Sequence, residues 1–402
     1  MKMLTLLALM ACSGSKDGAS VDTDTSVDEI GGATTDTGGE GSGTTGDDTG
    51  TSATDSGTSH TGGTSGGLDT ADTADTADTA DTGVIAIIDY AVAGRLGAGS
   101  LSEETVGGEG QALLMEVWYP SLDAGGEPRI YGFDDWYMDG ESRTGVAADC
   151  DEPKPVMIHS HGYGSINWEM FYLQEYLASH GWIIAAPDHP GNTFYDDGGL
   201  FSTLLWRRPV DVQDTYDWLL AESASPSSAL HGCVDPAAGY VASGYSFGGY
   251  TAYVTAGALA NSFGEPVLDY SDDRVTAVVT FAPWDGYDAI TTGTSSVAVP
   301  ALTLGGEVDA TVGTDFQDLF SHLTSTPRAM ASYPDAGHLS FTPVYCFSPG
   351  DGCGLDFVDP DALTGTLRTS TVAFLEHIQG APGALEQLPV DEAVLSWTII
   401  AP

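Results

Sequence analysis

Basic residues are scarce in this sequence. Its 402 residues include 11 lysines and arginines against 58 aspartates and glutamates, and the formal net charge is -47. Lys154 is the only lysine beyond residue 83. Nucleic acids and anionic membrane surfaces are bound through clusters of basic side chains, so this composition argues against both as partners of the folded part of the chain.

Large apolar residues are almost absent between Ser13 and Gly83. This tract consists mainly of Asp, Thr, Ser and Gly and ends in the repeat ADTADTADTADT. A segment that cannot bury apolar surface does not build a core, so we predict a disordered acidic linker over residues 13–83 that holds a folded domain away from a surface. Calcium binding by the repeated aspartates is not expected, because the loop of about twelve residues with a fixed glycine and a terminal glutamate is missing.

The sequence also lacks an apolar run long enough to cross a bilayer. Its N-terminus instead reads as a short export signal, in which Lys2 precedes an apolar stretch that ends in LMAC at Cys12. That ending resembles the lipobox of bacterial lipoproteins, which implies that Cys12 is lipidated, becomes the new N-terminus and tethers the chain to a membrane. The alternatives are an ordinary cleaved signal peptide or an apolar N-terminus. We therefore expect an exported protein, either secreted or held at the cell surface or outer membrane, with residues 1–12 as signal peptide and lipobox.

No CxxC pair occurs among the remaining cysteines, which are Cys150, Cys233, Cys346 and Cys353. An even set of cysteines in an exported chain favours disulfides over a zinc site, and no bound metal is expected. Cys346 and Cys353 bracket the short turn FSPGDG and are expected to pair with each other, which leaves Cys150 for Cys233. Free buried thiols are the alternative.

Beyond residue 83, short apolar runs alternate with longer helical patterns. This alternation predicts an α/β domain over residues 84–402, with a mostly parallel central sheet flanked by helices. The first two strands are expected to be antiparallel edge strands. Strands are predicted at 84–91, 112–119, 155–159, 182–186, 239–244, 275–282, 301–304 and 329–333, and helices at 168–179, 210–220, from 251 onward and at 366–378.

The motif GYSFGG, residues 244–249, lies between a predicted strand and a helical pattern. Its glycines permit a sharp strand-to-helix turn that exposes the hydroxyl of Ser246. The same GxSxG spacing recurs around Ser65, where no apolar strand or helix surrounds it. The spacing alone is therefore weak evidence, and the residues that accompany Ser246 decide its interpretation.

Asp309 and His338 each follow a predicted strand beyond Ser246. Ligands of an open parallel sheet bind beyond the carboxyl ends of its strands, and the order serine, aspartate, histidine is that of the α/β-hydrolase triad. A nucleophilic serine needs a base to take its proton and a carboxylate to orient that base. We predict these roles for Ser246, His338 and Asp309. Asp285, in the segment FAPWDG, is the alternative carboxylate.

The segment HSHGYGS, residues 159–165, follows another predicted strand and contains the HGxG pattern of an oxyanion loop. The backbone N–H groups of Tyr163 and of Phe247, the residue after the serine, are predicted to stabilise a tetrahedral oxyanion. His161 and His189 also lie near strand ends and compete for the role of base. His161 fits the oxyanion loop, however, and His189 precedes the serine in the chain.

Residues 84–380 resemble two groups of α/β-hydrolases. The segments HSHGYGS, LASHGWIIAAPDHPGN, RRPVDVQDTYDWL and GYSFGGY are similar to bacterial relatives of platelet-activating-factor acetylhydrolase and dienelactone hydrolase. True dienelactone hydrolases have a cysteine nucleophile, where this chain has Ser246. The segments LASHGW, GYSFGG, APWDG and VPALTLGGEVDATV are similar to cutinase-like polyester hydrolases, including those that cleave poly(ethylene terephthalate). The second resemblance implies that Tyr163 and Trp284 flank the acyl group as aromatic walls; core packing is the alternative for Trp284.

These features together predict a serine carboxylic-ester hydrolase that acts through an acyl-enzyme and needs no metal or organic cofactor. Its substrates are expected among short- to medium-chain esters, lipids and polyesters, with a dedicated polyester hydrolase as the narrower alternative. A non-catalytic binding module on a surface tether and a serine peptidase are the alternatives from other classes. We expect a monomer whose partner is the ester substrate and whose membrane contact is made only through the lipid anchor.

Two further segments have open interpretations. The apolar stretch 193–206 is expected either to form a hydrophobic rim over the site or to pack in the core. Arg207 and Arg208 are expected to form ion pairs with Asp211 and Asp214 that fix a helix, and not to contact the substrate.

Overall fold

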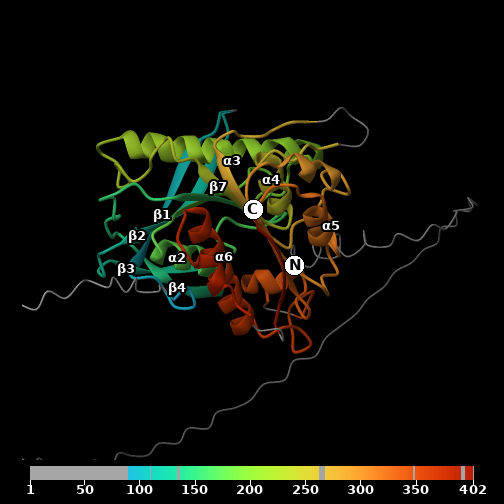
Figure 1. Cartoon of the computed structure of the whole chain (residues 1–402). Helices are drawn as coiled ribbons and strands as arrows, with labels where there is room; N and C mark the ends of the chain where they lie inside the picture. Colours follow the sequence, from blue (N-terminus) through green and yellow to red (C-terminus); the bar gives the residue numbers. More distant parts are fainter. Residues whose placement is uncertain are drawn as a thin grey trace, which may run out of the picture. The chain divides into compact units, whose positions relative to one another are not determined.

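The computed structural model describes residues 89–401 apart from 109, 134–135, 262–267, 347–348 and 391–393. The expected signal peptide with Cys12, the acidic linker and Ser65 lie outside these residues. The strands of the described part form one mixed sheet in the order β11-β10-β9-β8-β7-β5-β6-β2-β1-β4-β3, with helices on both faces (Figure 1). The predicted class, α/β with flanking helices, is confirmed.

The centre of the sheet is parallel. Neighbouring central strands pair in parallel from β6 through to β10. Parallel strands covered on both faces are almost continuously apolar, and every residue of β6, with the sequence IIAAP, is buried. All their carboxyl ends therefore lie along one edge of the sheet. The strands are β5 (Val156–Ser160), β6 (Ile183–Pro187), β7 (Tyr240–Tyr245), β8 (Val275–Phe281), β9 (Ala301–Gly306) and β10 (Arg328–Tyr333).

Antiparallel strands flank this centre. β2 (Ala112–Ser121) pairs with β6 on one side and β1 (Gly97–Val106) on the other, and β11 (Ser396–Ile400) pairs with β10. The antiparallel pair β3 (Glu127–Phe133) and β4 (Trp136–Thr144) extends the sheet beyond β1.

The N-terminal strand predictions were partly wrong. Of the strand predicted at 84–91, residues 84–88 are outside the described part and 89–91 form no strand. The strand predicted at 112–119 is present as β2, but it lies inside the sheet and not at its edge. The strand β1 was not predicted, because its sequence GAGSLSEETV has no apolar alternation and its strand conformation depends on pairing with β2.

Two layers of helices cover the sheet. Figure 1 shows α3 along one side of the sheet and α2 and α6 on the other. One apolar core joins α2 (Phe171–Ser179) and α6 (Pro360–Ile378) to the sheet. A second core joins α3 (Phe201–Ala224), α4 (Phe247–Thr255) and α5 (Asp315–His322) to the sheet. Short 3-10 helices complete the described part, namely η1 (Thr292–Ser296), η2 (His338–Phe341), η3 (Pro343–Tyr345) and η4 (Ala384–Gln387).

The predicted helix bounds needed correction. α3 begins at Phe201 and contains Pro209, although proline in a helix interior removes a backbone hydrogen bond. Buried Leu204 and Leu205 anchor the turn before the proline in the core, which explains why the helix continues through it. α6 begins earlier than predicted because Asp359 caps it, accepting hydrogen bonds from two backbone amides of its first turn, next to a proline at the first helical position.

Two disulfides join Cys150 to Cys233 and Cys346 to Cys353, the pairing that the sequence predicted. Disulfides of this kind are typical of oxidising environments. A search of the described residues finds no helix that is both long and apolar enough to cross a membrane.

Removal of the Cys150–Cys233 disulfide is expected to lower the free energy of unfolding by about 2–4 kcal/mol. The two cysteines are 83 residues apart in the sequence, so the crosslink restricts a long loop of the unfolded chain. Urea unfolding of the Cys150→Ser/Cys233→Ser double variant measures the loss. The matched control is Cys346→Ser/Cys353→Ser, whose loop spans only 7 residues and whose loss should be smaller. Equal midpoints for the long-loop variant and the wild type would contradict the expectation.

Candidate active site

Ser246 occupies a strained turn between β7 and α4. Its φ angle is 55°, a conformation that non-glycine residues rarely adopt. The backbone of Ser246 is held on both sides: its N–H donates to the carbonyl of Phe281 (3.0 Å), and its carbonyl accepts from the N–H of Trp284 (3.0 Å). The turn therefore places the serine hydroxyl at the carboxyl edge of the parallel strands.

The glycines of GYSFGG permit close backbone contacts at this turn. A Cβ on Gly248 would overlap the carbonyl oxygen of Ser160 at the end of β5, and a Cβ on Gly244 would overlap the backbone of Gly248. Side chains at either position would push the start of α4 away from the sheet. The sequence motif thus has a direct steric reason in the fold.

The structure brings Ser246, His338 and Asp309 into one hydrogen-bonded chain. Nε2 of His338 lies 2.9 Å from Oγ of Ser246, and Nδ1 of His338 lies 2.7 Å from Oδ2 of Asp309. The other oxygen of Asp309 accepts from the backbone N–H groups of Thr311 and Val312, each at 2.9 Å. These contacts fix the carboxylate, orient the imidazole and leave its second nitrogen to accept the serine proton.

Tyr163 and Phe247 lie next to each other beside this chain. Their ring centroids are 6.0 Å apart. Among the described residues, neither backbone N–H finds a hydrogen-bond acceptor. Such unpaired amides, one in the loop after β5 and one directly after Ser246, are what an oxyanion-binding pair requires.

The comparisons with known proteins identify the fold. No family model matches the sequence, and no curated protein is significantly similar to it. Among solved structures, the chain is similar to "Ferulic acid esterase from Streptomyces cinnamoneus", with a TM-score of 0.54 and 20% sequence identity over 76% of this chain and 96% of that chain. The chain has an α/β-hydrolase fold. At this identity the likeness concerns the fold alone.

In this α/β-hydrolase fold the alternative carboxylate, Asp285, has other partners. It accepts hydrogen bonds from the hydroxyl of Thr291 (2.8 Å) and the N–H of Asp288 (3.0 Å). Burial and the charge of Asp285 raise the pKa of neighbouring Asp315 above its usual range. The geometry therefore favours Asp309 as the partner of His338.

The competing histidines belong to a buried network behind the site. His189 connects the hydroxyl of Ser160 (2.8 Å) to the carboxylate of Asp211 (2.9 Å), and its backbone N–H donates to Nε2 of His161 (3.1 Å). Ser160, His189 and Asp211 thus repeat the serine-histidine-aspartate pattern with no exposed surface. Burial, together with the charge of Arg208, lowers the pKa of both imidazoles well below the usual value. Neither histidine is placed to act on a substrate.

The loops that carry Asp309 and His338 are joined by Asp351. The carboxylate of Asp351 accepts from the N–H of Ala310 (2.9 Å) and the hydroxyl of Thr311 (2.8 Å), directly after Asp309. Its backbone carbonyl accepts from the N–H of Leu339, directly after His338 (2.7 Å). The disulfide between Cys346 and Cys353 closes the segment that contains Asp351.

Aromatic rings form a continuous band beside Ser246. Phe201, at the start of α3, lies with its ring centroid 6.2 Å from Tyr163 and 5.8 Å from Trp284. Trp284 also packs against the rings of Phe247 (5.2 Å) and the exposed Tyr287 (5.0 Å). Trp284 therefore packs against the core and also belongs to the aromatic band.

The segment 193–206 contains both a residue that contacts the aromatic band and residues that pack in the core, so its expected role as a rim stays a prediction. Phe201 belongs to the aromatic band, whereas Leu204 and Leu205 are buried in the core beneath α3.

Only one of the two arginines of α3 behaves as expected. Arg207 forms an ion pair with Asp211 at 3.2 Å. The prediction for Arg208 was wrong, because its fully buried guanidinium donates to the carbonyl of His161 in the loop that carries Tyr163. Asp214 instead accepts from the N–H of Gly108 (2.7 Å).

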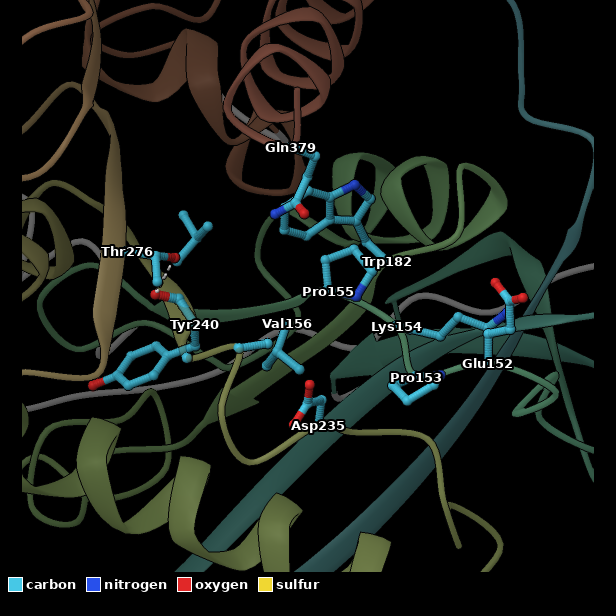
Figure 2. Close-up of a pocket in the computed structure, with 13 residues that line it drawn as sticks. Glu152, Pro153, Lys154, Pro155, Val156, Trp182, Asp235, Tyr240, Thr276 and Gln379 are labelled. Atoms are coloured by element: carbon cyan, nitrogen blue, oxygen red, sulfur yellow. Dashed lines mark hydrogen bonds between the residues drawn. The ribbon is translucent and has the colours of Figure 1, made fainter. Parts of the chain in front are cut away.

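A separate pocket lies at the opposite edge of the sheet. Figure 2 shows its lining, which includes Val156, Tyr240 and Thr276 from the amino ends of β5, β7 and β8, with Trp182 and Gln379 nearby. Its volume is about 380 Å³. Since Ser246 follows the carboxyl end of β7, this pocket is remote from the serine-histidine-aspartate chain.

Activity is expected to rise with pH through the titration of His338. Burial alone would lower the pKa of this imidazole, but the charge and hydrogen bond of Asp309 outweigh burial and raise the pKa, with Asp351 and Glu169 adding to the rise. Only the neutral imidazole can take a proton from Ser246. We therefore expect kcat/KM to fall as pH drops, with a midpoint above the ordinary histidine value of about 6.5. Initial rates between pH 5 and 9 measure this midpoint, and a midpoint at or below the ordinary value would contradict it.

Proposed function

We propose that this protein is a serine carboxylic-ester hydrolase. The observation that carries the proposal is the hydrogen-bonded chain from Asp309 through His338 to Ser246 at the carboxyl edge of the sheet. The strained conformation of Ser246 and the two unpaired amides beside it support the same conclusion. The fold is shared with a protein described as a ferulic acid esterase, which agrees with ester chemistry.

The reaction follows from the positions of these groups. Oγ of Ser246 attacks the ester carbonyl carbon while Nε2 of His338 takes its proton, and Asp309 stabilises the imidazolium that forms. The N–H groups of Tyr163 and Phe247 stabilise the negative oxygen of the tetrahedral intermediate. His338 then protonates the leaving alkoxide, and an acyl-enzyme on Ser246 remains. Water, deprotonated by His338, attacks this acyl-enzyme, and the acid is released as Ser246 regains its proton.

We propose that the acyl group of the substrate lies against the aromatic band of Tyr163, Phe201 and Trp284. The rings of Tyr163 and Phe201 are tilted and those of Phe201 and Trp284 lie edge to face, and aromatic surfaces at these distances favour flat or short acyl groups over long flexible chains. Aromatic polyesters contain such acyl groups, so a polyester hydrolase is the narrower form of this proposal.

The experiment that tests the proposal is turnover of p-nitrophenyl esters that differ only in the acyl part. Acetate, butyrate and benzoate are expected to be cleaved faster than decanoate, and a fluorophosphonate probe should label Ser246. Absence of labelling would favour the tethered binding module. Faster turnover of peptide than of ester substrates would favour the serine peptidase. Release of soluble products from a polyester film tests the narrower form.

We further propose that residues 84–402 are the catalytic domain of an exported monomer, tethered through Cys12 by the acidic linker 13–83. The two disulfides agree with an oxidising location. Metabolic labelling with palmitate in an expressing bacterium tests the tether, because the label should be absent from a Cys12→Ala variant.

A further inference from the structure

One peptide group beside the site is bound at both ends by buried charges of opposite sign. The carbonyl of His161 accepts a hydrogen bond from the guanidinium of Arg208, and the N–H of Gly162 donates to Oε1 of Glu169 at 2.9 Å. These two groups belong to the same peptide bond. Arg208 and Glu169 both have no exposed surface, so water does not compete for either contact.

The next peptide group of the chain supplies the N–H of Tyr163. The two peptides are joined through the φ and ψ angles of Gly162, so a change in the direction of the His161–Gly162 peptide is carried to the one that follows. The carbonyl of Gly162, in the same peptide as the N–H of Tyr163, accepts from the N–H of Ser165 at 3.3 Å and lies 2.7 Å from Nδ1 of His161. The orientation of the Tyr163 amide therefore depends on the contacts of its own peptide and on those of the peptide before it.

Arg208 also contacts the residue that supplies the second amide. Its guanidinium carbon lies 4.4 Å from the ring centroid of Phe247, within the range of a cation–π interaction. Hydrogen bonds to Asn192 (2.8 Å) and Ser160 (3.1 Å) fix the guanidinium in this position. A single cation thus contacts the peptide that precedes the Tyr163 amide and the side chain of the residue that supplies the second amide.

Glu169 holds the other side of the loop. Besides the amide of Gly162, it accepts a hydrogen bond from the hydroxyl of Ser165, which also bonds to the hydroxyl of Tyr345. Burial lowers the pKa of Arg208 to about 9, opposed by the charges of Glu169 and Asp211, so the guanidinium remains protonated at neutral pH. Burying two charges costs free energy, so the buried pair is weak evidence that Arg208 and Glu169 stabilise the fold. We therefore consider that they position the loop that carries Tyr163.

We propose that Arg208 and Glu169 are positioning residues that clamp the His161–Gly162 peptide and thereby aim the amides of Tyr163 and Phe247 at the developing oxyanion. This inference rests on the proposed ester hydrolysis and assigns the preorganisation of its oxyanion site to two side chains that never contact the substrate. The clamp acts on the transition state, where the oxyanion forms, and not on ground-state binding.

The test compares Arg208→Lys and Glu169→Gln in the full chain. Each is expected to lower kcat about 10- to 100-fold with little change in KM. This loss in kcat should not exceed the loss caused by removing a whole oxyanion donor. Binding of a trifluoromethyl ketone, which adds to Ser246 and forms an oxyanion, should weaken by a similar factor. The double variant should lose less than the product of the two single losses, because either change releases the same peptide.

The matched control is Arg274→Met. Arg274 also lies over an aromatic ring, that of Tyr216 at 5.0 Å, and forms an ion pair with Asp272 at 2.7 Å. It precedes β8 at the edge of the sheet opposite Ser246, so its loss should leave kcat unchanged.

The outcomes separate the clamp from the proposed function. If the wild type cleaves no ester, the proposed function fails. If the wild type is active and the folded Arg208 and Glu169 variants keep their kcat, or change only KM, the clamp is wrong. Glu169→Gln keeps the size of the side chain; if it nevertheless unfolds at the assay temperature by circular dichroism, the pair is a stability element and the proposal is overturned.

Discussion

Replacement of Ser246 by alanine is expected to abolish ester hydrolysis while the fold remains intact. Oγ of Ser246 is the atom that His338 faces at 2.9 Å, and no acyl-enzyme can form without it. Loss of the nucleophile in an established triad costs about 10⁶-fold in kcat, and the remaining rate comes from the oxyanion site and substrate binding. Alanine should relax none of the backbone contacts of the turn, which are made by the N–H and carbonyl groups.

The measurement is kcat on p-nitrophenyl acetate, with thermal unfolding as the check of the fold. Ser243→Ala is the matched control, because Ser243 lies on β7 shortly before Ser246 and is also buried, but its hydroxyl contacts His159 at 3.1 Å. We expect this control to stay within a few-fold of the wild type. A Ser246→Ala variant that retained more than a hundredth of the wild-type rate would exclude the serine mechanism.

A comparison of Asp309→Asn with Asp285→Asn is expected to give the second largest difference. Asparagine keeps the size of the side chain at position 309 but removes the charge that orients His338 through Nδ1 at 2.7 Å. In a serine-histidine-aspartate triad this change costs about 10⁴-fold in kcat, because the imidazole takes the wrong tautomer. Asp285 contacts Thr291 and the backbone of Asp288 instead, so Asp285→Asn should change kcat only slightly.

The pH profile gives an independent readout of the same assignment. Asp309 is what holds the pKa of His338 above its ordinary value against burial. In Asp309→Asn the midpoint of the residual activity should therefore move to lower pH, whereas Asp285→Asn should leave it in place. A loss of 10⁴-fold in Asp285→Asn, with Asp309→Asn near wild type, would reverse the assignment of the acid.

The central strands and the residues that follow them were predictable because each signal is local. The strands β5 to β10 are short apolar runs, and Ser246, Asp309 and His338 each come soon after the end of one of them. Parallel pairing then brings these three positions to one edge of the sheet. Whether they act in catalysis stays a prediction that the variants above test.

The features that the sequence did not reveal depend on distant partners. The strand β11 follows α6 and exists by pairing with β10, and β3 and β4 pair mainly with each other. Arg208 lies in the segment RRPVDVQDTYDWL, whose resemblance assigned it no role at the site, and Glu169 belongs to none of the motifs. Their common target, the His161–Gly162 peptide, becomes visible only when α3 and the loop after β5 are packed together.

The contacts of Asp351 with the loops of Asp309 and His338 divide the proposed catalytic triad into two rigid parts and not three. One part is the turn of Ser246, which is set by β7 and α4. The other is a joined acid and base, which Asp351 connects through Ala310, Thr311 and Leu339. Substitutions in the segment around Asp351 would therefore displace Asp309 and His338 together relative to Ser246. The sequence of this partly exposed loop is in this way constrained by the geometry of the buried site.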